Sequence, residues 1–220
     1  MKLLLVLIAF TLTTESYAQV FGVKAGMNLS KIMAMDDEDN YSDEYKMNPG
    51  FHVGPTVEFY LSELISFETG LLLSTKGFRM SEEETYFGDT YEYKIKANLL
   101  YIDVPILAKG NFVVGDVKIY GVLGPHIGMG LSGKFKEEYT ANGETETDEE
   151  VIEWGSDPDK HDIKRPDFGI TAGAGIEINS VQVGISYGLG LANISAYTEG
   201  GNKISNRVLG LSIGYKFGGN

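Results

Sequence analysis

The residues of this sequence that could do chemistry together are isolated charges, each set among glycine, serine, threonine or other small or polar neighbours. They are Lys24, Glu58, Glu68, Asp103, Lys118, His126, Glu177 and Lys216. Gathered in one interior, they would form either a polar conduit or ligand site, or a network of ion pairs, because buried charges must find partners. Which of the two forms depends on the space between the elements that carry these residues.

Metal chemistry has little support in the sequence. His52, His126 and His161 are the only histidines and cysteine is absent; because these histidines fall on different predicted strands and a loop, no converging zinc site is expected. The acidic run 36–40 offers the oxygens that calcium prefers, but it lacks the spacing and the glycine of an EF-hand loop. We interpret it as a solvated loop. Whether divalent ions bridge such loops to lipopolysaccharide is left open. No metal and no cofactor is predicted.

A hydrolytic site at the rim of the fold was the other chemical possibility. Asp159, His161 and Asp162 lie beside Ser156 in the longest predicted loop. No nucleophile motif surrounds the serine, and no acid can be paired with a base. The sequence therefore predicts that the protein is not an enzyme.

The elements that carry the isolated charges show a two-residue period. In the last of them, every second residue from Leu209 to Phe217 is apolar or aromatic and most of the residues between are small or polar. Strand side chains alternate between faces, so each such segment has one apolar and one polar face. The predicted strands are Val20–Ser30, Gly50–Leu61, Leu64–Phe78, Tyr93–Lys109, Val117–Leu131, Asp167–Ile178, Val181–Ala192 and Arg207–Phe217.

The connections between these segments alternate between long and short. The long ones are predicted as loops at Met33–Asn48, Arg79–Glu92, Ser132–Pro166 and Asn193–Asn206, and the first and third carry most of the surplus negative charge. Long outer loops and tight periplasmic turns are typical of outer-membrane barrels. Three prolines interrupt the pattern: Pro105 is placed near a strand end, whereas Pro55 and Pro125 fall in mid-strand and predict a local bulge or break.

Two packings could hide alternating strands. A soluble, lipocalin-like barrel points its apolar residues inward around a ligand, and a membrane barrel points them at lipid. The polar face is rich in glycine and serine with few charges, which suits a narrow lumen better than a soluble surface. We therefore predict an all-β, eight-stranded antiparallel up-and-down transmembrane β-barrel. An interior of that size is just wide enough for side chains, so the isolated charges are expected to form an ion-paired plug.

The N-terminus is typical of an export signal. Lys2 precedes the short apolar run Leu3–Leu12, and small residues flank Tyr17 at a cleavage site after Ala18. We expect residues 1–18 to be removed, residues 19–220 to form a single barrel domain, and the protein to reside in the outer membrane of a Gram-negative bacterium. The formal net charge of −13 argues against a nucleic-acid partner, since phosphate binding needs a basic surface.

Several segments resemble one known family. Phe21–Ser30 is similar to the opening strand of the PorT-like outer-membrane β-barrel family of Bacteroidetes-type bacteria, and Tyr101–Leu107 resembles its mid-barrel segment. Further matches are Gly121–Gly128, Asp167–Gly169, Tyr187–Leu191 and Asn206–Phe217, so the resemblance covers essentially the whole mature chain. It departs at the end, where Gly218–Asn220 follow the aromatic Phe217 on which such barrels commonly finish.

The resemblance implies family more than function. The founding member is associated with protein secretion, so we expect a structural or interaction protein of the envelope, in contact with outer-membrane lipid and with envelope or secretion proteins. Two alternatives stay open: a soluble or surface-associated lipocalin-like barrel that binds an apolar small molecule, and a narrow channel.

Overall fold

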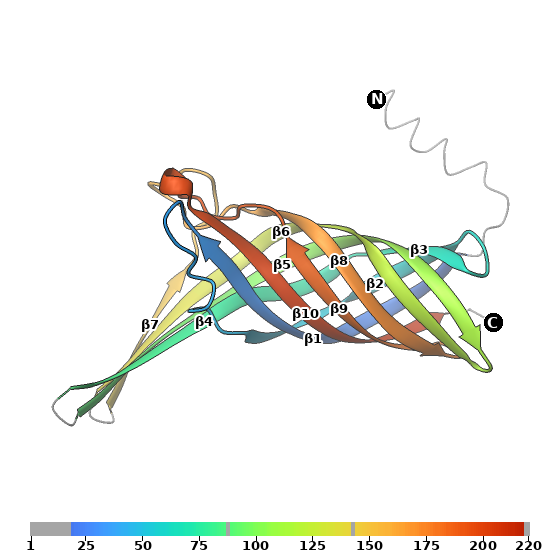
Figure 1. The fold of residues 1–220 in the computed structure, drawn as a ribbon, viewed down its shortest axis with the longest axis horizontal. Coiled ribbons are helices and arrows are strands. Elements are labelled where there is room, and N and C mark those ends of the chain that lie inside the picture. Colours follow the sequence, from blue (N-terminus) through green and yellow to red (C-terminus); the bar gives the residue numbers. More distant parts are fainter. Residues whose placement is uncertain (1–18, 87–88, 142–143, 218–220) are drawn as a thin grey trace.

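The computed structural model describes residues 19–86, 89–141 and 144–217, which form a closed antiparallel barrel with a ribbon projecting from one end (Figure 1). The elements are β1 (Gln19–Met35), β2 (Asn48–Tyr60), β3 (Ile65–Gly70), β4 (Leu72–Tyr86), β5 (Asp89–Val114), β6 (Val117–Ala141), β7 (Glu144–Val151), β8 (Pro166–Ile178), β9 (Val181–Gly190), the 3-10 turn η1 (Glu199–Gly201) and β10 (Lys203–Phe217). No helix among these residues is long and apolar enough to cross a bilayer. The predicted export signal, residues 1–18, and the end after Phe217 lie outside the described residues.

The ring closes because the last strand pairs with the first. β10 pairs with β1 from Phe217 opposite Phe21 to Lys203 opposite Met35, and the order continues through β2, the β3–β4 pair, β5, β6, β8 and β9 back to β10. β3 and β4 together form one barrel strand and β7 lies outside the ring, so the ring has eight strands. The predicted fold class is confirmed.

The third strand of the barrel is divided into β3 and β4 at the point opposite Pro55 of β2. β2 holds the same register on both sides of the gap, with Thr56 opposite Gly70 and Val53 opposite Leu73. The Leu71 N–H donates to the Pro55 carbonyl at 3.0 Å, but Pro55 has no N–H with which to return the bond. The predicted break at Pro55 is thus a lost ladder bond without a register shift.

Two details of the proline prediction need correction or extension. Pro105 lies in the middle of β5, not near a strand end, because β5 runs on to Val114. At Pro125, the β5–β6 pairing lapses between the Pro105–His126 and Ala108–Leu123 pairs. A glycine precedes both Pro55 and Pro125, and a Cβ there would meet a backbone oxygen of the neighbouring chain segment, at 2.0 Å for Gly54 and 2.1 Å for Gly124.

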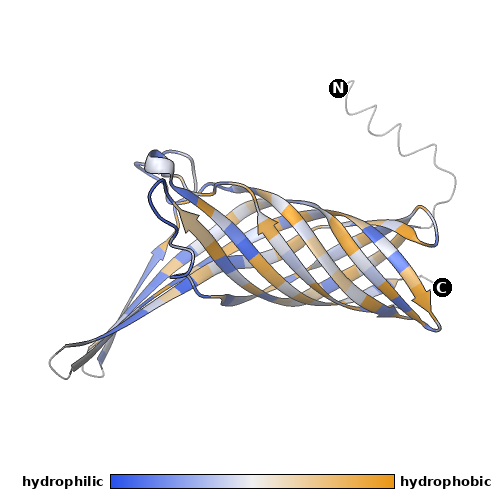
Figure 2. Cartoon of the chain, viewed as in Figure 1, coloured by the Kyte–Doolittle hydropathy of each residue, from blue (hydrophilic) through white to orange (hydrophobic). Residues whose placement is uncertain are grey.

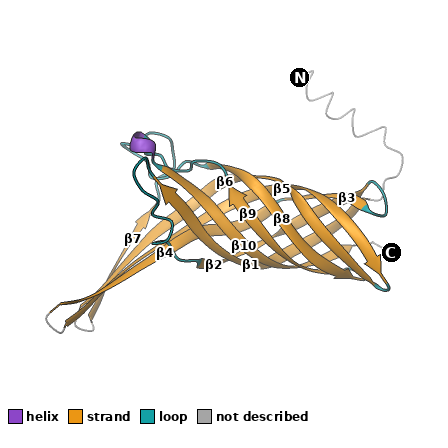
Figure 3. Ribbon diagram, in the orientation of Figure 1, coloured by secondary structure: helices purple, strands orange, loops and turns teal. Residues whose placement is uncertain are grey.

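Two predicted loops are largely strand. The segments expected as loops at Arg79–Glu92 and Ser132–Pro166 contain the ends of β4, β5 and β6 and all of β7, which form a four-stranded ribbon beyond the barrel (Figure 3). The prediction failed because it looked for apolar alternation. These strands are rich in charged and polar residues and show no sustained apolar alternation. They pair through contacts such as Tyr93 opposite Tyr139 and Lys136 opposite Glu149.

The apolar face points outward. Leu211 and Ile213 are 56% and 57% exposed, whereas the side chains of Lys24 and Glu68 inside the ring are 17% and 4% exposed. Figure 2 shows apolar residues alternating along the barrel strands, while the projecting ribbon is mostly hydrophilic. This orientation contradicts the soluble, lipocalin-like alternative, which would need the same side chains inside.

Candidate functional site

Charged side chains fill the barrel near the end with the short turns. Lys109 Nζ lies 3.0 Å from Glu58 Oε2 and 3.3 Å from Glu68 Oε2. Lys24 pairs with the other oxygen of Glu68, and Lys216 Nζ lies 2.7 Å from Glu58 Oε2. Lysine and glutamate therefore alternate across the lumen, and each glutamate bridges two lysines.

The alternation continues through Glu177. Its Oε1 accepts from Lys118 Nζ at 2.9 Å, and its Oε2 pairs with Lys216 and accepts from Gln182 Nε2 at 2.7 Å. Neutral groups satisfy what is left: Ser66 donates to Glu58 at 2.6 Å, and Lys109 Nζ sits 4.2 Å from the Tyr120 ring centroid. We call this set the short-turn network: Lys24, Glu58, Glu68, Lys109, Lys118, Glu177 and Lys216.

A second charge cluster lies further along the lumen. Lys76 Nζ is 2.8 Å from Asp103 Oδ1 and 2.9 Å from Asp167 Oδ2. Asn206 Nδ2 also donates to Asp167 Oδ2 at 2.9 Å, and Lys76 lies 4.5 Å from the Tyr101 ring centroid. This cluster has one lysine and two aspartates, whereas the short-turn network has four lysines and three glutamates. The two excess charges have opposite sign, so together the two groups are neutral.

The predicted site residues separate accordingly. Six of them share the short-turn network: Lys24, Glu58, Glu68, Lys118, Glu177 and Lys216. Asp103 belongs to the second cluster. His126 takes part in neither; its Nδ1 lies 2.9 Å from Thr171 Oγ1.

Sequence reasoning missed three charges that hold the lumen together: Lys76, Lys109 and Asp167. Lys109 has the same parity as Asp103, and Lys76 the same parity as Glu68, so strict alternation within the predicted strands already places both inside. They were missed because each lies close to a predicted strand boundary. Asp167 is buried, and it was missed for the same reason: it is the second residue of β8 and the first of the predicted strand.

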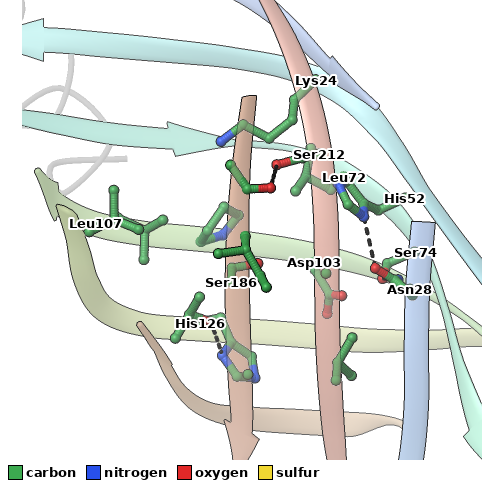
Figure 4. Close-up of a pocket in the computed structure, with 18 of the residues that line it drawn as sticks. Lys24, Asn28, His52, Leu72, Ser74, Asp103, Leu107, His126, Ser186 and Ser212 are labelled. Atoms are coloured by element: carbon green, nitrogen blue, oxygen red, sulfur yellow. Dashed lines mark hydrogen bonds between the residues drawn. The ribbon is translucent and has the colours of Figure 1, made fainter. Parts of the chain in front are cut away.

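A cavity of about 130 Å³ separates the two charge groups. Figure 4 shows Lys24, Asp103, His52 and His126 around it. His52 Nδ1 lies 2.8 Å from Asn28 Oδ1, and Leu72 contributes an apolar wall. A space of this size is large enough for a few water molecules, and its lining combines polar side chains such as Ser74 with apolar ones such as Leu107.

The end of the barrel with the long loops is closed by apolar packing. Tyr101 and Leu99 on β5 are buried against Ile152, Ile163 and Ile194 from the loops. The Trp154 ring packs edge-on against Tyr101 with centroids 5.6 Å apart. We call this the apolar cap: Leu99, Tyr101, Ile152, Ile163, Ala192 and Ile194.

The alternative chemical sites do not assemble in this structure. His161 Nδ1 lies 3.2 Å from the Asp157 carbonyl, and Asp162 Oδ2 accepts from the Glu153 N–H at 2.9 Å. Both side chains thus hold turns, and no hydrogen bond joins Ser156 to His161 among the described residues. No group of three potential metal ligands lies together in residues 19–86, 89–141 and 144–217.

The acidic run is an ordered turn at its start. Asp36 Oδ1 accepts from the backbone N–H groups of Asp39 and Glu38 at 2.8 Å each. These bonds, the one from Asp39 first, lower the pKa of Asp36, because they stabilise the ionised carboxylate. This carboxylate is therefore engaged by its own loop.

An apolar exterior, a closed ring and an interior of paired charges define an integral membrane β-barrel. The family model described as "Outer membrane protein beta-barrel domain" matches residues 17–196. The chain therefore belongs to that family, in contact with lipid in the outer membrane of a Gram-negative bacterium. Its long-loop end accordingly faces the outside and its short turns the periplasm.

Solved structures of outer-membrane proteins match the chain at low similarity. Ail of Yersinia pestis, crystallised with the heparin analogue sucrose octasulfate, is 19% identical with a TM-score of 0.34, covering 90% of this chain and 99% of Ail. Neisserial surface protein A is 12% identical (TM-score 0.44; 90% and 97% covered), and OprG of Pseudomonas aeruginosa is 13% identical (0.43; 91% and 97%). These values are too low to transfer any role. No curated protein matches the chain.

Proposed function

We propose that the protein is a non-conducting, non-enzymatic outer-membrane barrel whose role is structural: it anchors an outer interaction surface of an envelope or secretion assembly. The observation that carries this proposal is the closure of the lumen at both ends, by the short-turn network and by the apolar cap. A conducting path would have to cross alternating Lys–Glu contacts of 2.5–3.3 Å and then a dry hydrophobic cluster. Both place paired or packed side chains in the way of a hydrated ion.

The ribbon is the part of the molecule best suited to meet a partner. β7 is exposed along its whole length and carries alternating glutamate and threonine at its start. It forms the edge of the ribbon, and an unpaired strand edge offers backbone groups to another chain. Its charge favours a partner with a basic surface. The resemblance to PorT-like barrels supports a partner in protein secretion, and the expected export signal, residues 1–18, is consistent with delivery to the envelope.

Conductance tests the closed lumen. The chain without residues 1–18, refolded in detergent and added to a planar bilayer, should give no current steps above the lipid baseline at any holding potential. Heat-modifiable gel mobility confirms beforehand that the barrel is folded. Regular steps from folded protein would show an open path and refute a purely structural role.

Crosslinking tests the interaction surface. A photoreactive residue at Thr147, exposed on β7, should give a discrete crosslinked species with an envelope protein in intact cells. A matched probe at Asp116, exposed in the short β5–β6 turn, samples the opposite end of the barrel. If neither probe, or only the Asp116 probe, yields a product, the ribbon is not the partner surface.

A narrow channel is the second candidate, favoured by one observation. The lumen is polar and already holds a cavity of about 130 Å³ between two charge groups. Conduction would require both the short-turn network and the apolar cap to open. Replacing Ile152 and Ile194 with alanine removes apolar packing from the cap; steps that appear only in this variant would indicate a channel gated by the cap.

A further inference from the structure

Four positive charges lie side by side, one in the connection between β1 and β2 and three on the projecting ribbon. Lys46 is bridged to Arg79 on β4, Arg79 lies opposite Lys96 on β5, and Lys96 lies opposite Lys136 on β6. Residues directly opposite one another point to the same face with Cβ atoms about 4.5–5.5 Å apart, and like charges so placed are destabilising. We call Lys46, Arg79, Lys96 and Lys136 the basic row. A bound anion would offset the repulsion between these four charges.

The protein supplies only part of that anion. Lys136 Nζ lies 2.6 Å from Glu138 Oε1, and Lys136 also stands opposite Glu149 on β7. The hydrogen bond to Glu138 first, and the charge of Glu149 in addition, raise the pKa of Lys136. Lys46 Nζ donates to the backbone oxygen of Ser81 at 3.4 Å and to Ser81 Oγ at 3.3 Å. Among the side chains that the structure describes, no carboxylate forms an ion pair with Arg79 or Lys96. The middle of the basic row is therefore the part least compensated.

The face of the ribbon that carries the basic row continues the lipid-facing surface of the barrel. On β5, Leu99 and Tyr101 point inward, so by alternation Lys96 lies on the outer side together with Leu100 and Ile102. On β6 the exposed residues preceding the row are Met129 and Leu131, at 49% and 40% exposure. One outward-facing polar position, occupied by Asn98 on β5 and Lys134 on β6, separates the row from the apolar belt. The row therefore lies near the level where lipid headgroups begin.

We propose that the basic row binds the phosphate groups of phosphorylated glycolipid headgroups in the outer leaflet. A groove of about 500 Å³ runs along it and includes Ser81 and Glu138, which can hydrogen-bond sugar hydroxyls. Lysine and arginine form strong charge-assisted hydrogen bonds with phosphate. The adjoining belt selects a lipid over free phosphate, since the acyl chains of the ligand can lie on Leu100 and Leu131 while its headgroup meets the row. Because the whole chain has a net charge of −13, this group of positive charges stands out against its overall acidity.

The test is lipid binding measured by native mass spectrometry on the folded chain released from detergent micelles. The probe is an acylated glucosamine disaccharide carrying two phosphates, compared with the same lipid from which both phosphates have been removed. The phosphorylated lipid should bind about tenfold more tightly or better, as expected when hydrogen bonds to charged groups are gained. The double variant Lys96→Gln/Lys136→Gln should lose about that factor.

The matched control removes two positive charges elsewhere at the same end of the molecule. Lys160→Gln/Lys164→Gln, in the loop after β7, should leave binding within about twofold of the parent, as for exposed charges that make no specific contact. Heat-modifiable gel mobility verifies folding, and Lys96→Arg/Lys136→Arg, which keeps the charges, should retain the preference for phosphate.

Three results would overturn the proposal. The first is equal binding of the phosphorylated and phosphate-free lipids to the parent chain, which needs no variant. The second is an equal loss in the control variant, which would indicate bulk charge attraction. The third is displacement of the lipid by an equimolar amount of inorganic pyrophosphate, which would indicate a site for free phosphate and not for a lipid.

Discussion

The two ends of the barrel are closed by opposite kinds of chemistry. At the short-turn end the seal is ionic, with Lys109 fully buried between Glu58 and Glu68. At the long-loop end the seal is apolar, with Ile194 and Tyr101 fully buried in the cap. The difference follows from the elements that supply each seal: the barrel wall must turn its apolar residues to lipid and keeps charges inside, whereas the loops are free to bury apolar side chains.

The ionic seal depends on single residues more strongly than the apolar seal does. In the ionic seal, removing one partner leaves an uncompensated charge in a confined space, which costs more than the pair was worth. In the apolar seal, each side chain contributes its own area and the neighbours can partly close the gap. We therefore expect larger single-residue effects, and stronger rescue by a second substitution, at the short-turn end.

The largest effect is expected for Lys109→Met. It leaves Glu58 and Glu68 without their shared cation, so the free energy of unfolding in urea and detergent should fall by about 3–5 kcal/mol. Glu58 then keeps only Lys216 and Glu68 only Lys24. Adding Glu58→Gln should recover a good part of the loss, because it removes one of the two carboxylates that lost a lysine. A double variant less stable than the single one would contradict the ionic account of this end.

Ile194→Ala should have the next largest effect. Its side chain is fully buried in the apolar cap, and truncation should cost about 2–5 kcal/mol, depending on how far the cap collapses. Because the cap is made mainly by loops, the loss should show first as faster proteolysis after Lys160 or Lys164, with the barrel still heat-modifiable. Loss of the folded barrel at an equal rate would show that the two ends are not independent.

Gly54→Ala tests the barrel wall between the two seals. The new Cβ would lie 2.0 Å from the Leu71 carbonyl oxygen, so the strands must shift locally, at a cost of about 1–3 kcal/mol. Gly110→Ala on β5, where a Cβ meets nothing within 4 Å, is the matched control and should be close to neutral. Equal urea midpoints for the two variants would show that the close approach of Leu71 to Gly54 does not constrain the wall.

The smallest effect is expected for an ion pair outside the lumen. Lys134 Nζ lies 3.3 Å from Glu149 Oε2 on the ribbon, and the two side chains are 64% and 51% exposed. Lys134→Met should change the free energy of unfolding by about 0.2–1 kcal/mol at most. A loss comparable with that of Lys109→Met would mean that burial does not decide the strength of the short-turn network.

Much of the barrel wall could be predicted from the sequence because apolar and polar residues alternate along each barrel strand. Alternation predicted that Leu211 and Ile213 lie outside and that the eight candidate site residues share the lumen face; the structure joins six of the eight in one network. It did not extend to the ribbon, where β7 is exposed along its whole length and the end of β6 is rich in charged residues. Register between strands is also invisible to alternation, so the partners of Lys109 and Lys76 could not be named even where their faces were known.

The apolar cap was beyond prediction for a different reason. Ile152, Ile163 and Ile194 are scattered through segments with no period, and only the tertiary fold brings them to Tyr101. The family resemblance covered the strands and left these loops unmatched. The wall of the barrel follows from local pattern, and its closure at the long-loop end does not.

The most direct test of the account is an accessibility scan along β10. The chain has no cysteine, so single cysteines at Leu211, Ser212, Ile213 and Gly214 can carry a nitroxide label in lipid vesicles. We predict strong relaxation by dissolved oxygen at 211 and 213, because lipid surrounds the wall. We predict weak relaxation by a water-soluble nickel chelate at 212 and 214, because the lumen is sealed. Strong relaxation by nickel at 212 and 214 would show an open, water-filled pore and contradict the account.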